Sequence, residues 1–379
     1  MVDIPGVGLY FHIPFCKSKC VYCDFNSYAG AEQWYAKYHT ALLQEFTSVR
    51  DRWPVKARSV YFGGGTPTVL PAEYLFELLN RVPLDTACNE VSVEANPGTV
   101  SPDALRLFRR AGINRISLGM QSLEDRELAL LGRIHDRETA IQSFQLVREA
   151  GFANVNVDLI FGLPMQALGA WRKTLNDVLL LEPEHIALYA LTLEHDVPLG
   201  QLVAGGSVPP PDDDAVAEMY EWSAQRLHSA GYEHYEISNW ALPGKQCAHN
   251  LIYWHNEPYL GLGAGAWSYW QGRRSGNVKA IEAYITRCNS GSSVVEETEL
   301  VSLSQEMADT LILGLRLVEG VRFADFEARF GLSLQQRYGS QIESQKARGL
   351  LEVDACGIRL TGRGRLLGNE VFEQFLVPG

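Results

Sequence analysis

The sequence lacks long apolar runs and has no excess of basic residues. None of its apolar stretches approaches the roughly 18 residues of a membrane-spanning helix. The formal net charge is −12, which disfavours a general binder of nucleic acids or of anionic membranes. Residues 1–6 contain neither the basic segment nor the apolar core of a signal peptide. We therefore expect a cytoplasmic protein.

Cysteine is scarce, and most of it is scattered. Four of the seven cysteines stand alone, with no regular spacing between them. This distribution is typical of a reducing compartment, where free thiols behave as small apolar side chains. The isolated cysteines are Cys88, Cys247, Cys288 and Cys356.

The other three cysteines, Cys16, Cys20 and Cys23, share one short loop with the spacing C-x3-C-x2-C. Cysteine thiolates hold iron–sulfur clusters, and three of them leave one iron of a four-iron cluster open to a small chelating molecule. A structural zinc site would need C-x2-C pairs and a fourth ligand within reach. Three incidental core cysteines are a further alternative, which the crowding of the loop disfavours. We therefore expect a 4Fe–4S cluster here.

The cysteine spacing, followed by Phe25, resembles the signature of the radical S-adenosylmethionine (SAM) enzymes. The run from Tyr10 to Cys16, Y-F-H-I-P-F-C, is similar to the branch that contains oxygen-independent coproporphyrinogen III oxidase (HemN) and the heme chaperones (HemW). The resemblance covers nearly the whole chain. It implies that the cluster passes one electron to SAM and cleaves a C–S bond, while the protein orients the cofactor and excludes water and oxygen.

The first half of the chain alternates β-rich runs with amphipathic segments. Strands are expected at 8–13, 59–63, 91–95, 115–119, 155–160 and 185–191. Helices are expected at 32–50, 71–81, 102–111, 137–150, 169–181 and 218–230. Such alternation predicts parallel βαβ units. Six of them predict an α/β fold with a partial (β/α)6 barrel, which is also what the resemblance implies.

The pattern changes from about Leu303 to two helices, a hairpin over 349–361 and a last helix. This order resembles a winged helix. Because no sustained basic recognition helix is present, we expect a cap over the barrel mouth and not a DNA-binding domain. The predicted domains are a radical SAM core over 1–240, a connecting region over 241–300, and a C-terminal domain of the HemN type over 301–379.

Candidate site residues follow the ends of the predicted strands, where parallel barrels place their chemistry. The second strand ends in Gly63, Gly64, Gly65 and Thr66, so a ligand could reach the backbone there, although a tight turn would explain the glycines equally. For the charged residues, structural ion pairs are the alternative. By resemblance, the SAM contacts are Tyr10, Gly64, Gly65, Thr66, Glu94, Gln121, Arg133 and Asp158.

A second motif, H-N-x-x-Y-W, begins at His249 and resembles the signature of the chaperone members of the branch. His249 would supply an imidazole to heme iron, and Tyr253 and Trp254 would give flat apolar contact to the macrocycle. A hydrogen-bonded core histidine in an aromatic patch is the alternative.

Two features separate the sequence from the oxidases that it resembles. Phe25 stands where the oxidases carry a further cysteine, and only nine residues precede Tyr10 where they have a long N-terminal extension. We therefore expect a heme chaperone with a 4Fe–4S cluster, SAM and heme as cofactors. Coproporphyrinogen oxidase is the alternative, and an RNA-modifying radical SAM protein is disfavoured by the acidic charge.

The expected partners are heme and apo-hemoproteins such as respiratory-chain enzymes, as the resemblance implies. No nucleic-acid partner is expected from the charge of the chain. A homodimer and peripheral contact with membrane complexes are left open.

Overall fold

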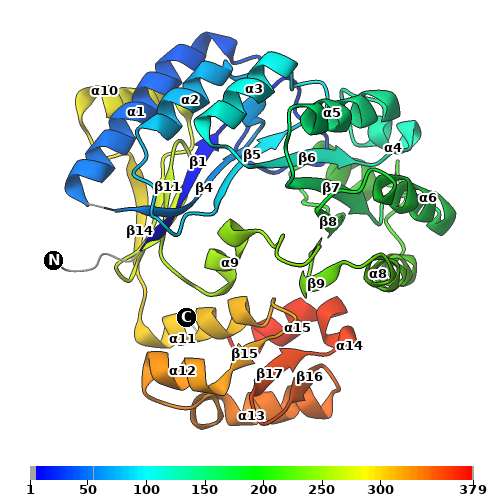
Figure 1. The fold of residues 1–379 in the computed structure, drawn as a ribbon. Coiled ribbons are helices and arrows are strands. Elements are labelled where there is room, and N and C mark those ends of the chain that lie inside the picture. Colours follow the sequence, from blue (N-terminus) through cyan, green and yellow to red (C-terminus); the bar gives the residue numbers. More distant parts are fainter. Residues whose placement is uncertain (1–5, 54, 378–379) are drawn as a thin grey trace.

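The computed structural model describes residues 6–53 and 55–377, and one 12-stranded sheet forms its centre (Figure 1). The middle of the sheet is parallel. In spatial order these strands are β11 (Tyr259–Leu262), β1 (Val7–Ile13), β4 (Ala57–Gly64), β5 (Glu90–Ala95), β6 (Arg115–Gln121), β7 (Val155–Phe161) and β8 (His185–Ala190).

Antiparallel strands extend both sides of the parallel region, so the sheet stays open. Beyond β8 lie β10 (Asn239–Ala241) and β9 (Glu233–Glu236). Beyond β11 lie β12 (Trp267–Trp270), β13 (Arg273–Asn277) and β14 (Val295–Leu300). The predicted α/β fold with a partial barrel is confirmed, and each of the six predicted strands is present.

Strand β11 is parallel to β1 and was not predicted. Its last two residues, Gly261 and Leu262, begin the glycine-rich stretch 261–266, which turns the chain immediately after the strand. Gly263 adopts φ 104°, and a Cβ atom there would lie 2.5 Å from the carbonyl oxygen of His12. Glycine is therefore required at this turn, both for its backbone conformation and for the close approach of β1.

Helices cover the outer face of the parallel strands (Figure 1). Ser101 and Asp212 cap two of them by accepting hydrogen bonds from the amides of Ala104 (3.3 Å) and Ala215 (3.1 Å). The helices of this layer and its loops are α1 (Tyr35–Arg52), α2 (Ala72–Asn80), α3 (Pro102–Ala111), α4 (Asp125–Leu130), α5 (Arg137–Glu149), α6 (Leu168–Leu179), α7 (Pro198–Ala204), α8 (Asp213–Ser229) and α10 (Ile281–Ser290).

The parallel strands have one apolar face and one polar face. Side chains such as Phe11 and Phe62 pack with Phe108 of α3 in a single hydrophobic core. The other face, turned away from these helices, follows the period of two residues that strands impose. Neighbouring strands bring its polar or small residues side by side: Tyr10 beside Tyr61, Tyr61 beside Ser92, Glu94 beside Ser117, Gly119 beside Asp158.

The C-terminal part has its own core, which includes Leu311, Phe326 and Ile342. Its helices are α11 (Leu303–Gly314), α12 (Phe323–Phe330), α13 (Leu334–Ala347), α14 (Gly362–Leu366) and α15 (Gly368–Glu373). A small sheet joins β15 (Val321–Arg322), β17 (Gly357–Leu360) and β16 (Leu351–Val353) in that order. Among the described residues, no helix combines the length and the apolar character needed to cross a membrane.

The C-terminal part does not cap the barrel mouth, so that prediction is wrong for the described residues. It contacts α9 (Ala248–Trp254), which lies between the sheet and the C-terminal part (Figure 1). Asn256 donates to Thr310 of α11 at 3.0 Å, and Arg329 of α12 donates to the carbonyl of Asn256 at 2.9 Å. Helix α9 approaches Gly8 near the start of β1, where a Cβ atom would lie 3.0 Å from Ile252. Helix α9 therefore lies at the N-terminal ends of the strands.

Candidate functional site

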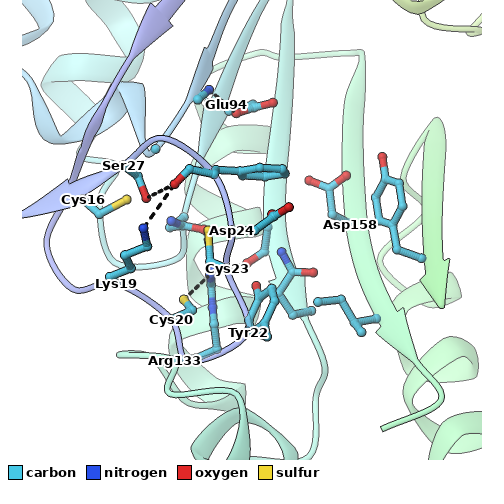
Figure 2. A pocket seen from close by; sticks show the side chains of 18 of the residues that line it. Cys16, Lys19, Cys20, Tyr22, Cys23, Asp24, Ser27, Glu94, Arg133 and Asp158 are labelled. Carbon is cyan, nitrogen blue, oxygen red and sulfur yellow. Dashed lines mark hydrogen bonds between the residues drawn. The ribbon is translucent and has the colours of Figure 1, made fainter. Parts of the chain in front are cut away.

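A cavity of about 410 Å³ lies at the C-terminal ends of β4 to β8, beside the cysteine loop (Figure 2). The structure brings the three loop cysteines and most of the predicted SAM residues to this one cavity. Those that line it are Cys16, Cys20, Cys23, Gly64, Gly65, Glu94, Gln121, Arg133 and Asp158. Thr66 and Tyr10 are not among the lining residues. Thr66 lies beside Cys16, with its hydroxyl 3.6 Å from Sγ, and Tyr10 bonds Nδ1 of His12 at 3.0 Å.

The cysteine loop lies between two short paired strands, β2 (Phe15–Cys16) and β3 (Tyr28–Ala29). The thiols are spread around one end of the cavity (Figure 2). Within residues 6–53 and 55–377, no three His, Cys, Asp or Glu side chains gather around a single-ion position. Burial raises the pKa of the Cys16 thiol, and the Thr66 hydroxyl opposes this shift. The Arg133 guanidinium donates a hydrogen bond to Sγ of Cys20 at 3.3 Å, so a positive charge lies beside this sulfur.

The glycine loop that follows β4 packs directly against the cysteine loop. A Cβ atom on Gly65 would lie 2.6 Å from the carbonyl oxygen of Phe15 and 3.0 Å from Sγ of Cys16. Gly64 adopts φ 117°, and a Cβ atom there would lie 2.7 Å from the His12 ring. The absence of side chains is thus needed for the close approach of two backbone segments, and it also leaves backbone open at the cavity wall.

The carboxylates of Glu94 and Asp158 face the cavity without a cationic partner. Glu94 accepts hydrogen bonds from the Tyr61 hydroxyl (2.9 Å) and the Gly64 amide (3.0 Å). Burial raises the pKa of Glu94 to about 7, with a further increase from the charge of Asp158. Asp158 accepts from Ser117 (3.1 Å) and Asn156 (2.7 Å), and burial raises its pKa as well. Neither carboxylate forms an ion pair with any described residue. The arrangement favours a cationic ligand.

Gln121 and Arg133 leave polar atoms unpaired at the same cavity. Gln121 adopts φ 66°, a conformation that L-residues rarely adopt, where the register between β6 and β7 shifts. Its Oε1 is buried and has no hydrogen-bond partner within the described part of the chain, and neither has Nε of Arg133. The other nitrogens of Arg133 are occupied, with Nη2 donating to Gly119 at 2.6 Å. An unpaired acceptor and an unpaired donor suit a ligand that carries both amino and carboxylate groups.

Several cavity residues were missed by the sequence analysis, among them Tyr61, Ser117 and Tyr189. The sequence does mark them, because polar or small residues recur at alternate positions along these strands. Tyr61 shares its face of β4 with Gly63, and Ser117 shares its face of β6 with Gly119. Reading each strand as two faces, and not only at its C-terminal end, would have found them.

His249 lies at the other end of the barrel interior, on α9. It is 1% exposed and outside the cavity. Its Nδ1 is 2.8 Å from the Ser59 hydroxyl, and its Nε2 is 2.9 Å from the Tyr253 hydroxyl. Burial lowers the pKa of His249 to about 4, so the imidazole is neutral. Because both ring nitrogens have partners, a bond to heme iron would require His249 to leave at least one of them, and the heme-ligand role stays a prediction.

The donor set at the cavity fits an iron–sulfur cluster and SAM. Three thiols from one loop match the thiolate ligands of such clusters. Arg133 suits the carboxylate of SAM, and Glu94 and Asp158 suit its cationic groups. The glycine loop contacts both groups of residues, because the Gly64 amide donates to Glu94 at 3.0 Å and a Cβ atom on Gly65 would lie 3.0 Å from Sγ of Cys16.

Comparison with known proteins gives matches along nearly the whole chain. Residues 10–178 match the Radical SAM superfamily, and residues 301–367 match the HemN C-terminal domain. The heme chaperone HemW of Bacillus subtilis is 37% identical, over 97% of this chain and 98% of the relative. HemW of Escherichia coli is 35% identical, over 99% of this chain and 100% of the relative.

The structure of coproporphyrinogen III oxidase (HemN) from Escherichia coli superposes with a TM-score of 0.85. That match covers 98% of this chain and 90% of the oxidase at 24% identity, so it shows a shared fold alone. The sequence relatives decide between the branches, because full-length matches above 30% identity carry the chaperone name. The radical SAM superfamily implies a 4Fe–4S cluster and SAM, for which the cavity supplies the residues. The chain belongs to the HemW heme chaperone family of the radical SAM superfamily.

Proposed function

We propose that this protein binds heme and transfers it to apo-hemoproteins, with a 4Fe–4S cluster and SAM as resident cofactors. The observation that carries the proposal is the full-length similarity to heme chaperones, at 35–38% identity across both the radical SAM core and the C-terminal domain. The fold itself does not separate chaperone from oxidase, because the oxidase HemN shares it.

Phe25 supports the chaperone over the oxidase. It lines the cavity and is 63% exposed, at the position where the oxidases carry a further cysteine by resemblance. A phenyl ring offers no thiol for ligation or proton transfer. We therefore propose that the cavity holds its cofactors without decarboxylating coproporphyrinogen.

In the proposed arrangement Cys16, Cys20 and Cys23 hold the cluster, and the cavity residues orient SAM. When bound, SAM supplies a carbon–sulfur bond that an electron from the cluster can cleave. The residues of this chain would hold its charged groups: the guanidinium of Arg133 would hold the carboxylate, and the Glu94 carboxylate would hold a cationic group.

We place heme at α9, with His249 as an iron ligand. This placement requires His249 to leave Ser59 or Tyr253 and to become accessible. Trp254 and Tyr253 on the same helix would then offer aromatic surface to the macrocycle. The guanidinium of Arg316 lies 4.4 Å from the centre of the Trp254 ring, so α9 has a cation beside it that would suit the carboxylates of heme.

Hemin titration of anaerobically purified protein tests the heme site. We expect a Soret band and heme retained through gel filtration for the wild type. His249→Gln keeps hydrogen-bonding capacity but removes the imidazole, and we expect it to lose heme while it keeps its iron and sulfide. His255→Gln, at an exposed histidine just beyond α9, is the matched control and should behave as the wild type. Unchanged heme retention in His249→Gln would return His249 to a structural role.

A parallel assay separates chaperone from oxidase. Reconstituted protein is incubated with SAM, a reductant and coproporphyrinogen III, and the porphyrins are analysed after oxidation. We expect coproporphyrinogen to persist. Steady formation of protoporphyrinogen IX would refute the chaperone proposal in favour of the oxidase.

We further propose a cytoplasmic location, because the cluster needs reduced thiols and all seven cysteines are free in the structure. The proposed recipients are apo-hemoproteins. Co-purification of the heme-loaded protein with candidate recipients, compared with His249→Gln, would test this.

A further inference from the structure

Tyr61 of β4 lies between the cavity and α9. Its hydroxyl donates to Oε1 of Glu94 at 2.9 Å, on the cavity side. Its ring stacks on the imidazole of His249, with centroids 5.1 Å apart and planes inclined by 25°. One side chain therefore touches a residue assigned to SAM and the residue assigned to heme.

His249 is held in a closed position by contacts from several elements. Ser59 and Tyr253 bond its two ring nitrogens, and the Tyr253 ring meets it edge-on at 5.1 Å. Glu90 of β5 fixes the start of α9 by accepting from the amides of Ala248 (2.9 Å) and His249 (3.2 Å). Heme ligation would need an open position in which at least one ring nitrogen of His249 has lost its partner. A helix with these two arrangements would respond to ligands that favour one over the other.

We infer that Tyr61 couples the two sites, so that SAM in the cavity holds His249 in the closed position and loss of SAM favours its release to heme. This inference rests on the proposed function, since it takes SAM and heme as the two ligands. Linkage requires the reciprocal effect, in which bound heme weakens SAM binding by the same factor.

The direction of the coupling follows from the chemistry of the Tyr61–Glu94 hydrogen bond. SAM carries an ammonium and a sulfonium group, and positive charge in the cavity favours the ionised form of Glu94. A hydroxyl bonded to a carboxylate is held about twice as strongly as one bonded to a neutral acid. The Tyr61 ring, fixed by its hydroxyl, is then held more firmly against His249.

A second hydrogen-bonded route also leaves the cavity, from Asp158 through Asn156, His185 and Tyr235. It ends at the backbone amide of Cys247, 3.3 Å from the Tyr235 hydroxyl, and does not touch the His249 side chain. Tyr61 is therefore the residue on which the test is built.

The test compares the wild type with Tyr61→Phe, which keeps the ring and loses the hydroxyl. Tyr284→Phe is the matched control, because Tyr284 also donates its hydroxyl to a buried carboxylate, Glu45, at 2.5 Å and away from the cavity. Anaerobically reconstituted protein is studied with and without saturating SAM, after SAM affinity has been measured for each variant. The two readouts are hydrogen–deuterium exchange of residues 248–254 and the dissociation constant for hemin.

In the wild type and in Tyr284→Phe we expect SAM to slow exchange in α9 and to weaken hemin binding by about fivefold or more, the lower range of measured couplings. For Tyr61→Phe we expect SAM to change the exchange rate of α9 and the dissociation constant for hemin by less than about twofold each. An equal response to SAM in Tyr61→Phe and in the wild type would overturn the inference, as would tighter hemin binding with SAM. If SAM slows exchange in α9 in the wild type but not in Tyr61→Phe, and hemin binding does not respond, the link from the cavity to α9 through Tyr61 stands. The assignment of heme to His249, which belongs to the proposed function, then fails.

Discussion

Replacing Glu90 by Gln is expected to loosen the start of α9. The Glu90 carboxylate is 4% exposed and accepts from the amides of Ala248 (2.9 Å) and His249 (3.2 Å) and from the thiol of Cys247 (3.3 Å). Hydrogen bonds to charged groups contribute about 1.5–3 kcal/mol, compared with about 0.5–1.5 kcal/mol for neutral pairs. The loss of charge therefore removes about 1 kcal/mol per bond, or about 3 kcal/mol in all.

Arg115 makes this figure a lower bound. Its side chain is 2% exposed. Burial lowers the pKa of Arg115, but the neighbouring Cys247 and Glu90 outweigh burial and raise it. In Glu90→Gln the guanidinium keeps its charge in a buried site and loses a negative neighbour, which destabilises the folded state further.

Hydrogen exchange of residues 248–254 measures the effect directly, since it reports the free energy of local opening. A loss of about 3 kcal/mol corresponds to exchange about 100-fold faster. Glu77→Gln is the control, because Glu77 of α2 forms a solvent-exposed ion pair with Arg81, just beyond the end of this helix, and it should leave α9 unchanged. A change below about threefold in Glu90→Gln, which is under 1 kcal/mol, would refute the claim that its charge anchors the helix.

Three further predictions concern the cavity. Replacing any of the three loop cysteines by Ala should abolish iron and sulfide binding, whereas Cys356→Ala should not, as elemental analysis after anaerobic reconstitution would show. Burial raises the pKa of Glu94 to about 7. The folded protein therefore holds a proton that the unfolded chain releases at lower pH. The contribution of Glu94 to the free energy of unfolding falls as pH rises from about 4.5 to about 7, by on the order of 3 kcal/mol. Unfolding of Glu94→Gln should lack this decline, and stability profiles that run parallel to the wild type would contradict it. Gln121→Gly should relieve the left-handed backbone and stabilise the apo-protein by about 1 kcal/mol in thermal unfolding, while weakening SAM binding in calorimetry. Unaltered SAM affinity would count against a role for the Gln121 amide.

The regular part of the fold could be predicted from the sequence because its signals are local. The run 155–160 is apolar at alternate positions and was placed within one residue of β7, and Ser101-Pro102 marked the start of α3. Strand β11 was missed because it has only four residues, one of them glycine, and its pairing with β1 joins segments about 250 residues apart. The predicted position of the C-terminal part was wrong. The local sequence pattern indicates whether a segment is a helix or a strand, but not the end of the barrel against which it packs.

The candidate site also contains residues that could be predicted from the sequence and residues that could not. The cysteine loop was predicted because its three thiols are close along the chain. Glu94 and Asp158 followed from a general rule, that parallel strands gather their C-terminal ends on one side. Tyr61 was missed because it lies inside β4, whereas the candidate residues were sought at the C-terminal ends of the strands. Its importance comes from contacts with Glu94, on the next strand, and with His249, which lies almost 190 residues later.

The motif that contains His249 determines which side chain is present, but it does not determine whether the ring nitrogens of that side chain are free to bind a metal. The run H-N-x-x-Y-W provides an imidazole that can ligate iron, and the same run places Tyr253 one helical turn later, where its hydroxyl occupies Nε2. The partner of Nδ1, Ser59, comes from β4 and not from the motif. The closed position is therefore a property of the folded barrel, and its stability depends on the residues of β4 and β5 that surround His249. Because Tyr61 of β4 also bonds Glu94 at the cavity, the availability of His249 to heme is expected to depend on what the cavity holds.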